Sequence, residues 1–231
     1  MNFYGHAVFA ARLSTDRGFV LGSMLPDFEG MSGTRLVATS HDGIRDGVAL
    51  HHATDSVFHG APEFLELCSG GLAALTELGI PRATARAVAH VGTELVFDSY
   101  LIASHGEERE YVASLESAHP GELGPSMEFT DGGGRFEALR RRLVEFGVPR
   151  AYDDAGFVAD RLVNALASRP RLAMHDGERD RVADWVAAAR PRILGIAGAL
   201  ERRVADALNV SRTPVRADGP LPADRRPQRD A

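Results

Sequence analysis

Apolar residues recur at steps of three and four in one segment after another, and this spacing limits the fold more than any other feature of the chain. Phe3, Ala7, Ala10 and Leu13 are the first example. Such spacing places apolar side chains on one face of an amphipathic α-helix. No segment shows sustained alternation or dense use of Val, Ile and Thr, so no strand can be placed. The sequence therefore predicts an all-α fold.

The predicted helices are separated by segments rich in glycine and proline. They cover residues 2–13, 44–59, 63–78, 81–104, 136–146, 155–168, 179–189 and 191–208. Residues 21–28 contain Gly22 and Pro26 and are predicted as a helix end or turn, with Asp27 at a bend. Residues 120–134 are predicted as a long loop for the same reason.

One domain is expected from residues 1–210, because a chain of 231 residues with 44% hydrophobic residues can bury a sizeable core. Residues 1–105 carry most of the histidines and are expected to build a metal-site half, which helices from residues 135–210 would cover. Residues 211–231 offer almost nothing to bury and are predicted as a disordered tail.

Charge and missing residue types exclude several functions. All 26 basic residues are arginine, which excludes a Schiff-base lysine and the lysine of a phosphate-binding P-loop. The net charge of -6 argues against a general nucleic-acid binder. Cys68 cannot form an internal disulfide, and no stretch reaches the roughly 18 apolar residues of a membrane span. With no signal-peptide pattern after Met1, we expect a cytoplasmic protein with neither nucleic acid nor a membrane as partner.

Two predicted helices each carry an imidazole and a carboxylate along one face. Residues four apart project from the same side of a helix, so the two faces can meet across a cation. The metal ligands predicted from these helices and from the N-terminal segment are His6, Asp27, His51, Asp55, His59, His90 and Asp98. Such nitrogen and oxygen donors suit a divalent ion of manganese, iron, zinc or magnesium better than a metal that prefers thiolates.

A structural interpretation exists for each of these residues. A single histidine or aspartate on a helix usually caps a helix or satisfies a buried hydrogen bond. Burying two polar faces together without an ion or water is costly, however, and this favours a metal site for the set as a whole. The alternative is a non-catalytic helical protein in which the polar faces form a structural metal site or a hydrogen-bond network.

Four short segments resemble successive motifs of the acyl carrier protein phosphodiesterase family. They are Met1–His6, Gly22–Phe28, Gly47–Asp55 and Asp98–Leu101, in the order of the family. That family is similar to the wider HD-type group of helical metal-dependent phosphohydrolases. The resemblance covers roughly residues 1–105 and implies an HD-domain-like helical bundle.

The resemblance implies a metal centre, a reaction and a partner. The positions that the family keeps around its metal centre correspond to His6, Asp27, His51, Asp55 and Asp98. The implied reaction is hydrolysis of the phosphodiester that joins 4'-phosphopantetheine to a serine of acyl carrier protein, with manganese as the expected ion. The chain departs from the family at His52, where arginine is usual, and at Phe58 and His59, where the family has Thr-Asp.

A second resemblance retains the same class of reaction. Leu25–Asp27 after a short N-terminal helix, with histidines spread over several helices, is similar to bacterial zinc-dependent phospholipase C-like proteins. Those proteins also cleave phosphodiesters. A phosphodiesterase or phosphatase that acts on another small or lipid substrate is therefore the alternative within the enzyme class.

Proton transfer and phosphate binding also have candidate residues. Glu94 and His52 are candidates for handling protons at a metal-bound water, or for holding ligands in place. Arg140, Arg141 and Arg142 form a dense basic group. Guanidinium groups bind phosphate and acidic partners, so this group is the predicted docking site for acyl carrier protein or for a small phosphodiester. A solvated helix face is its structural interpretation.

Overall fold

The structure is a computed structural model that describes residues 1–175 and 177–209, so the predicted tail lies outside the described residues. Its helices are α1 (Phe3–Leu13), α2 (Arg17–Ser32), α3 (Asp42–Gly60), α4 (Pro62–Glu77), α5 (Arg82–Ser104), α6 (Glu108–Ser117), α7 (Gly134–Phe146), α8 (Ala155–Leu166) and α9 (Glu178–Ala207). The short elements are β1 (Leu36–Thr39), β2 (Met127–Phe129) and the 3-10 turns η1 (Gly124–Ser126) and η2 (Arg150–Asp153). The prediction of an all-α fold is confirmed.

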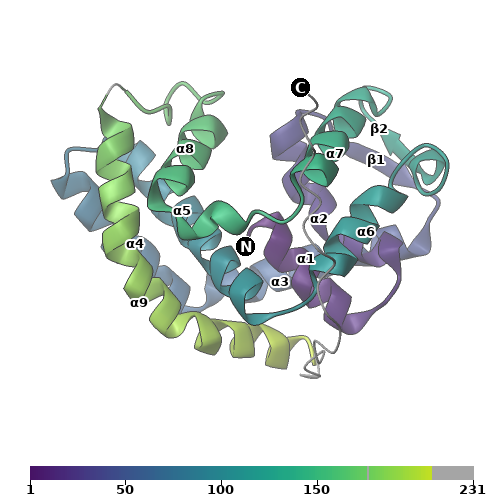
Figure 1. Cartoon of the computed structure of the whole chain (residues 1–231), viewed down its shortest axis with the longest axis horizontal. Helices are drawn as coiled ribbons and strands as arrows, with labels where there is room; N and C mark the ends of the chain where they lie inside the picture. Colours follow the sequence, from purple (N-terminus) through teal and green to yellow (C-terminus); the bar gives the residue numbers. More distant parts are fainter. Residues whose placement is uncertain (176, 210–231) are drawn as a thin grey trace, which may run out of the picture.

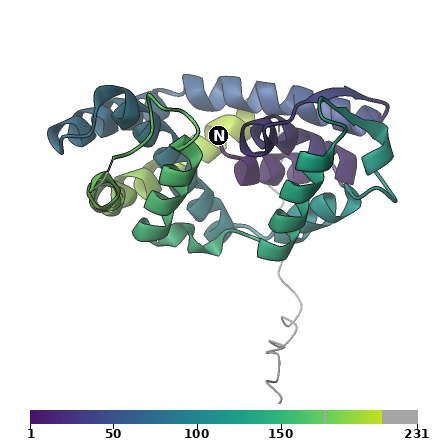
Figure 2. The same cartoon turned by 90° about the horizontal axis from the view of Figure 1, so that it is seen from above.

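The helices form two adjoining halves (Figure 1). One half contains α1, α2, α3, α6, α7 and the strands, and the other contains α4, α8 and the first parts of α5 and α9. Helix α5 joins them, because Phe97 and Leu101 lie in the core of the first half and Val88 in the core of the second. The N-terminus lies in the middle of the molecule in both views (Figure 2).

Helices α2 and α3 make the most extensive contact between two elements. A Cβ atom on Gly22 would lie 2.2 Å from the carbonyl oxygen of Ile44, and one on Gly47 would lie 2.2 Å from that of Phe19. Atoms cannot approach so closely, so only glycine permits this crossing of the two backbones. The crossing brings α2 and α3 together next to Asp27 and therefore positions the polar residues described below.

The helix breaks predicted at Pro26 and at Pro191 are wrong. Residues 21–28 lie inside α2 with Pro26 in its interior, and α9 continues through Pro191. A proline inside a helix removes one backbone hydrogen bond and is unfavourable. In α2 this cost is offset by packing, because Met24 and Phe28 are buried on either side of Pro26.

The predicted loop of residues 120–134 contains η1 and β2, and β2 pairs with β1 in an antiparallel sheet. Leu36 lies opposite Phe129 in this sheet. Strands of four and three residues are too short to show alternation in a sequence, which explains why they were not predicted. Among the residues that the structure describes, no helix has the length and apolar character needed to cross a membrane.

We predict that Gly47→Ala destabilises the protein, because the added methyl group collides with the backbone of Phe19. Overpacking of this kind costs about 1–3 kcal/mol of unfolding free energy. Gly30→Ala on α2 is the control, since a Cβ there has no neighbour within 4 Å. It should raise the stability by about 0.5–1 kcal/mol through helix propensity. Urea denaturation followed by circular dichroism measures both changes, and equal effects would contradict the account of the crossing.

Candidate metal centre

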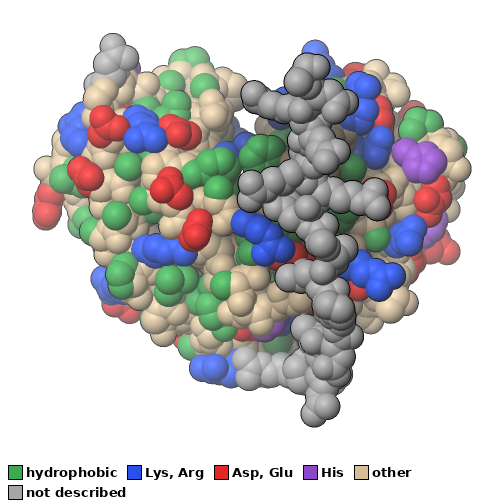
Figure 3. Space-filling view, viewed as in Figure 1, with side chains coloured by type: hydrophobic (Ala, Val, Ile, Leu, Met, Phe, Trp, Pro, Cys, Tyr) green, Lys and Arg blue, Asp and Glu red, His purple; other side chains and the backbone are tan. Residues whose placement is uncertain are grey.

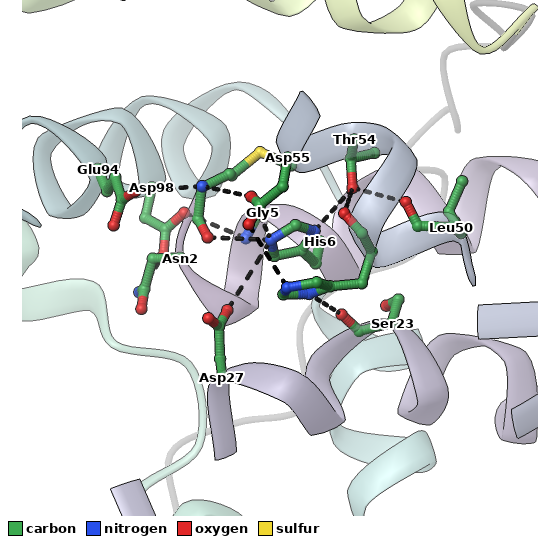
Figure 4. A network of polar contacts seen from close by, with 12 residues as sticks. Asn2, Gly5, His6, Ser23, Asp27, Leu50, Thr54, Asp55, Glu94 and Asp98 are labelled. Atoms are coloured by element: carbon green, nitrogen blue, oxygen red, sulfur yellow. Dashed lines mark hydrogen bonds and ion pairs between the residues drawn. The ribbon is translucent and has the colours of Figure 1, made fainter. Parts of the chain in front are cut away.

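Polar side chains from several helices meet in one network (Figure 4). His6 comes from α1, Asp27 from α2 and His51 from α3. One ligand atom from each of these residues lies within 4.8 Å of the other two. These three residues, called the first group below, could hold a metal ion. The structure thus brings together three of the ligands predicted from the sequence.

His51 presents a nitrogen lone pair to this site. Its Nδ1 lies 2.9 Å from the carbonyl oxygen of Ser23, which only accepts hydrogen bonds, so Nδ1 carries the proton. Burial lowers the pKa of His51, so the ring is neutral and Nε2 is unprotonated. This Nε2 lies 3.5 Å from Oδ2 of Asp55, which is also an acceptor. Two acceptors that face each other favour a cation between them.

His6 differs from His51, because its Nε2 carries the proton. Its Nδ1 lies 2.9 Å from the hydroxyl of Thr54, and that hydroxyl lies 2.8 Å from the carbonyl oxygen of Leu50. Nε2 lies 2.9 Å from the carbonyl oxygen of Met1 and 3.2 Å from Oδ1 of Asp55, and neither oxygen can donate, so Nε2 is the donor. A cation at Nε2 requires the other tautomer, in which Nδ1 donates to Thr54 and Thr54 donates to Leu50. Burial lowers the pKa of His6 to about 3, which keeps the ring neutral.

Asp27 contributes a carboxylate oxygen without a partner. Its Oδ2 is buried and accepts no hydrogen bond from any described residue, and it lies 3.9 Å from Nε2 of His6. Burial raises the pKa of Asp27 well above its usual value. Buried oxygen atoms in proteins are nearly always hydrogen-bonded or bound to an ion. The first group together with Asp55 therefore fits a divalent cation with nitrogen and oxygen ligands.

A second group consists of His59, His90 and Glu94, whose ligand atoms also lie within 4.8 Å of one another. Oε1 of Glu94 lies 2.8 Å from Nε2 of His59 and 3.1 Å from Nε2 of His90. The amino group of Met1 lies 3.1 Å from the same carboxylate oxygen and 2.8 Å from Oδ1 of Asp55. This amino group therefore bridges the carboxylates of Asp55 and Glu94.

The second group contains positive charges of its own. Hydrogen bonds with Cys68 and with Glu94 raise the pKa of His90 to about 9, so this imidazole is protonated at neutral pH. Burial opposes ionisation of Glu94, but the amino group of Met1 and the two histidines hold the pKa of this carboxyl well below its usual value. The carboxylate charge of the second group is thus balanced by the chain, whereas the free Oδ2 of Asp27 has no such partner.

Asp98 and His52, both predicted as site residues, belong to neither group. Asp98 is fully buried and accepts hydrogen bonds from the side chain of Asn2, at 2.6 Å, and from the backbone nitrogen of Gly5, at 3.1 Å. Burial raises the pKa of Asp98 to about 7. Asp98 therefore anchors the start of α1. His52 is exposed and meets the ring of His51 edge-on.

The three arginines predicted as a docking site have different surroundings in the structure. Arg140 binds both carboxylate oxygens of Glu137, at 2.6 and 2.7 Å, so its guanidinium group already has an anionic partner on α7. Arg141 is exposed, with its Nε 3.8 Å from Glu137. Arg142 instead lines a pocket.

The groups that sequence reasoning missed are mainly backbone and hydroxyl groups. Ser23 contributes a carbonyl oxygen, Thr54 a hydroxyl and Met1 its amino group. Thr54 could have been noticed, because it lies three residues after His51 on the same helix. A carbonyl oxygen or an amino group has no signature in a sequence.

Comparisons with protein-family models, with curated proteins and with solved structures found no match, so the interpretation of this site rests on its geometry.

We predict that His51→Ala lowers the affinity for manganese or zinc, because it removes a ligand nitrogen from the first group. A loss of at least about a hundredfold is expected, beyond the 10–100-fold effect usual for residues that only support a ligand. The matched control is His52→Ala, the adjacent exposed histidine, which should bind metal like the unmodified protein. Isothermal titration calorimetry gives both affinities. An equal loss in the two variants would contradict the assignment.

We also predict that metal affinity rises with pH from mildly acidic to neutral conditions. The raised pKa of Asp27 means that the carboxyl keeps its proton where an ordinary aspartate has lost it, and a cation must displace that proton. Calorimetry in buffers of different ionisation enthalpy should detect the released proton. Asp27→Asn should bind metal more weakly and lose this release, whereas Asp46→Asn, at an exposed position on α3, should retain it. Metal binding without proton release would show that Asp27 is not a ligand.

Proposed function

We propose that the protein is a metal-dependent phosphodiester hydrolase whose cation is held by His6, Asp27, His51 and Asp55. The observation that carries this proposal is the free Nε2 of His51 beside the unpartnered Oδ2 of Asp27. A divalent cation at such a site lowers the pKa of a bound water and stabilises charge on phosphoryl oxygen atoms. Two imidazoles and two carboxylates form a ligand set that supports manganese, with iron, zinc and magnesium as alternatives.

The surrounding residues hold the ligands in the state that a cation requires. The carbonyl oxygen of Ser23 fixes both the orientation and the tautomer of His51. The hydroxyl of Thr54 can accept from Nδ1 of His6, which is the tautomer that a cation at Nε2 would require in place of the hydrogen bond to the carbonyl oxygen of Met1. Because burial keeps both rings neutral, His51 can bind as it stands, and His6 only has to move its proton from Nε2 to Nδ1. Supporting hydrogen bonds of this kind are a regular feature of metal-binding histidines.

The second group supplies the proton donor in this proposal. The side chain of His90 is 43% exposed, is protonated at neutral pH and donates a hydrogen bond to the buried Glu94. It can therefore give a proton to the leaving oxygen of a substrate that approaches from solvent. Glu94 then orients His90 instead of accepting a proton itself. His52, the other candidate proposed from the sequence, faces solvent beside the site.

For the substrate we propose the phosphodiester of 4'-phosphopantetheine on holo-acyl carrier protein. Support comes from the resemblance of residues 1–105 to the acyl carrier protein phosphodiesterase family, since His6, Asp27, His51 and Asp55 occupy matching positions. The same resemblance supports an HD-like arrangement of the helices, manganese as the ion and a cytoplasmic location. A non-catalytic metal-binding protein remains the alternative from a different class.

We predict that the purified protein with added manganese hydrolyses bis(p-nitrophenyl) phosphate and releases 4'-phosphopantetheine from holo-acyl carrier protein. Asp27→Asn and His51→Ala should lower kcat/KM by at least about a hundredfold, because each removes a group that holds the cation. Asp46→Asn is the control and should keep full activity. Release of p-nitrophenol is followed by absorbance, and the carrier protein is followed by mass spectrometry.

The outcomes separate the alternatives. Cleavage of the synthetic diester without action on the carrier protein would point to another small or lipid phosphodiester. Stoichiometric metal that is lost in His51→Ala, but no hydrolysis of either substrate, would favour the non-catalytic metal protein. Hydrolysis that survives both substitutions would contradict the proposed site.

A further inference from the structure

A pocket lies between α7 and α8, where the two halves of the molecule face each other. Its walls are largely apolar and include Leu139 and Leu143 from α7 and Phe157 from α8, and it has a volume of about 80 Å³. Phe146 and Phe157 stack across it with ring centroids 6.4 Å apart. The space-filling view shows an indentation between the two halves with hydrophobic and basic side chains beside it (Figure 3).

Two guanidinium groups line this otherwise apolar pocket. Arg142 comes from α7 and Arg161 from α8, and neither forms an ion pair with a carboxylate of the described chain. Arg140, on the same helix as Arg142, is by contrast bound to Glu137. Two cations without a carboxylate partner beside an apolar wall complement a ligand with an anionic group and an apolar portion.

Tyr111 provides an independent sign of a ligand. Its side chain lines the pocket and is only 1% exposed, yet its hydroxyl has no hydrogen-bond partner among the described residues. A buried hydroxyl without a partner is unusual in a folded protein, because its desolvation is not compensated. A polar atom of a bound molecule would supply the missing hydrogen bond.

The pocket adjoins the candidate metal centre. Met31 lines the pocket one helical turn after Asp27, and Phe3 lines it directly after Asn2. Tyr152, also in the wall, interacts with the side chains of both Asn2 and Arg161. Asn2 donates to Asp98, which also accepts from the backbone of Gly5, so a short chain of contacts connects Arg161 with the start of α1, the helix that carries His6.

We propose that the α7–α8 pocket is the substrate-binding site and that it selects phosphodiesters with an elongated, largely apolar arm. In this assignment, which rests on the proposed function, Arg142 and Arg161 bind anionic oxygen atoms of the substrate and the apolar wall binds its arm. Small diesters without such an arm can reach the metal centre but gain nothing from the pocket. The pocket thus sets substrate preference, whereas the first group sets the chemistry.

Binding of alkyl phosphates in the presence of EDTA tests the pocket without catalysis. Calorimetry should show hexyl phosphate binding at least about tenfold more tightly than methyl phosphate, because the longer chain is buried against the apolar wall. Arg142→Gln and Arg161→Gln should each weaken hexyl phosphate binding by about tenfold. Arg109→Gln, at an exposed position on α6 outside the pocket, is the control and should bind like the unmodified protein.

A thermal unfolding curve for each variant shows whether it is folded, and Arg161→Lys should recover part of the affinity because it keeps the charge. Equal binding of the two alkyl phosphates, or an equal loss in Arg109→Gln, would overturn the proposal. Failure of the proposed function has a different signature. If the alkyl phosphates bind as predicted but no diester is hydrolysed, the pocket is confirmed as a binding site and the proposed enzymatic function is wrong. If diesters are hydrolysed at rates that depend neither on arm length nor on the two arginines, only the assignment of the pocket is wrong.

Discussion

The crossing of α2 and α3 at Gly22 and Gly47 is the contact on which the geometry of the polar centre depends. Gly22 directly precedes Ser23, whose carbonyl oxygen binds Nδ1 of His51, and Gly47 lies one helical turn before His51. A side chain at either glycine would separate the two helices and with them this hydrogen bond. A requirement of backbone packing therefore determines which nitrogen of a buried histidine is free to bind a cation.

The distribution of charge distinguishes the two groups of ligands. Glu94 lies next to the protonated His90 and the amino group of Met1, so its negative charge is neutralised within the chain. Asp27 is buried with one oxygen unpartnered, and the facing nitrogen of His51 is unprotonated. Burying such acceptors without a cation is unfavourable. This asymmetry is the physical reason for placing the ion at the first group and the proton donor at the second.

The spacing of polar residues predicted much of this centre. His51, Asp55 and His59 were expected on one helix face because they are four residues apart, and the structure places all three around the centre. Spacing along one helix does not reveal what lies opposite, so the amino group of Met1 could not be predicted. Asp27 was predicted as a ligand but placed at a bend, because the preference of proline for helix ends is a local rule that the packing of α2 overrides.

The central claim is that a divalent cation binds between His6, Asp27, His51 and Asp55. The most direct measurement is a crystal structure of the manganese-loaded protein, with anomalous diffraction collected at an energy where manganese scatters strongly. We expect one anomalous peak within coordination distance of Nε2 of His51 and Oδ2 of Asp27. A peak at His59, His90 and Glu94 with none at the first group, or no peak in a well-ordered crystal, would contradict it.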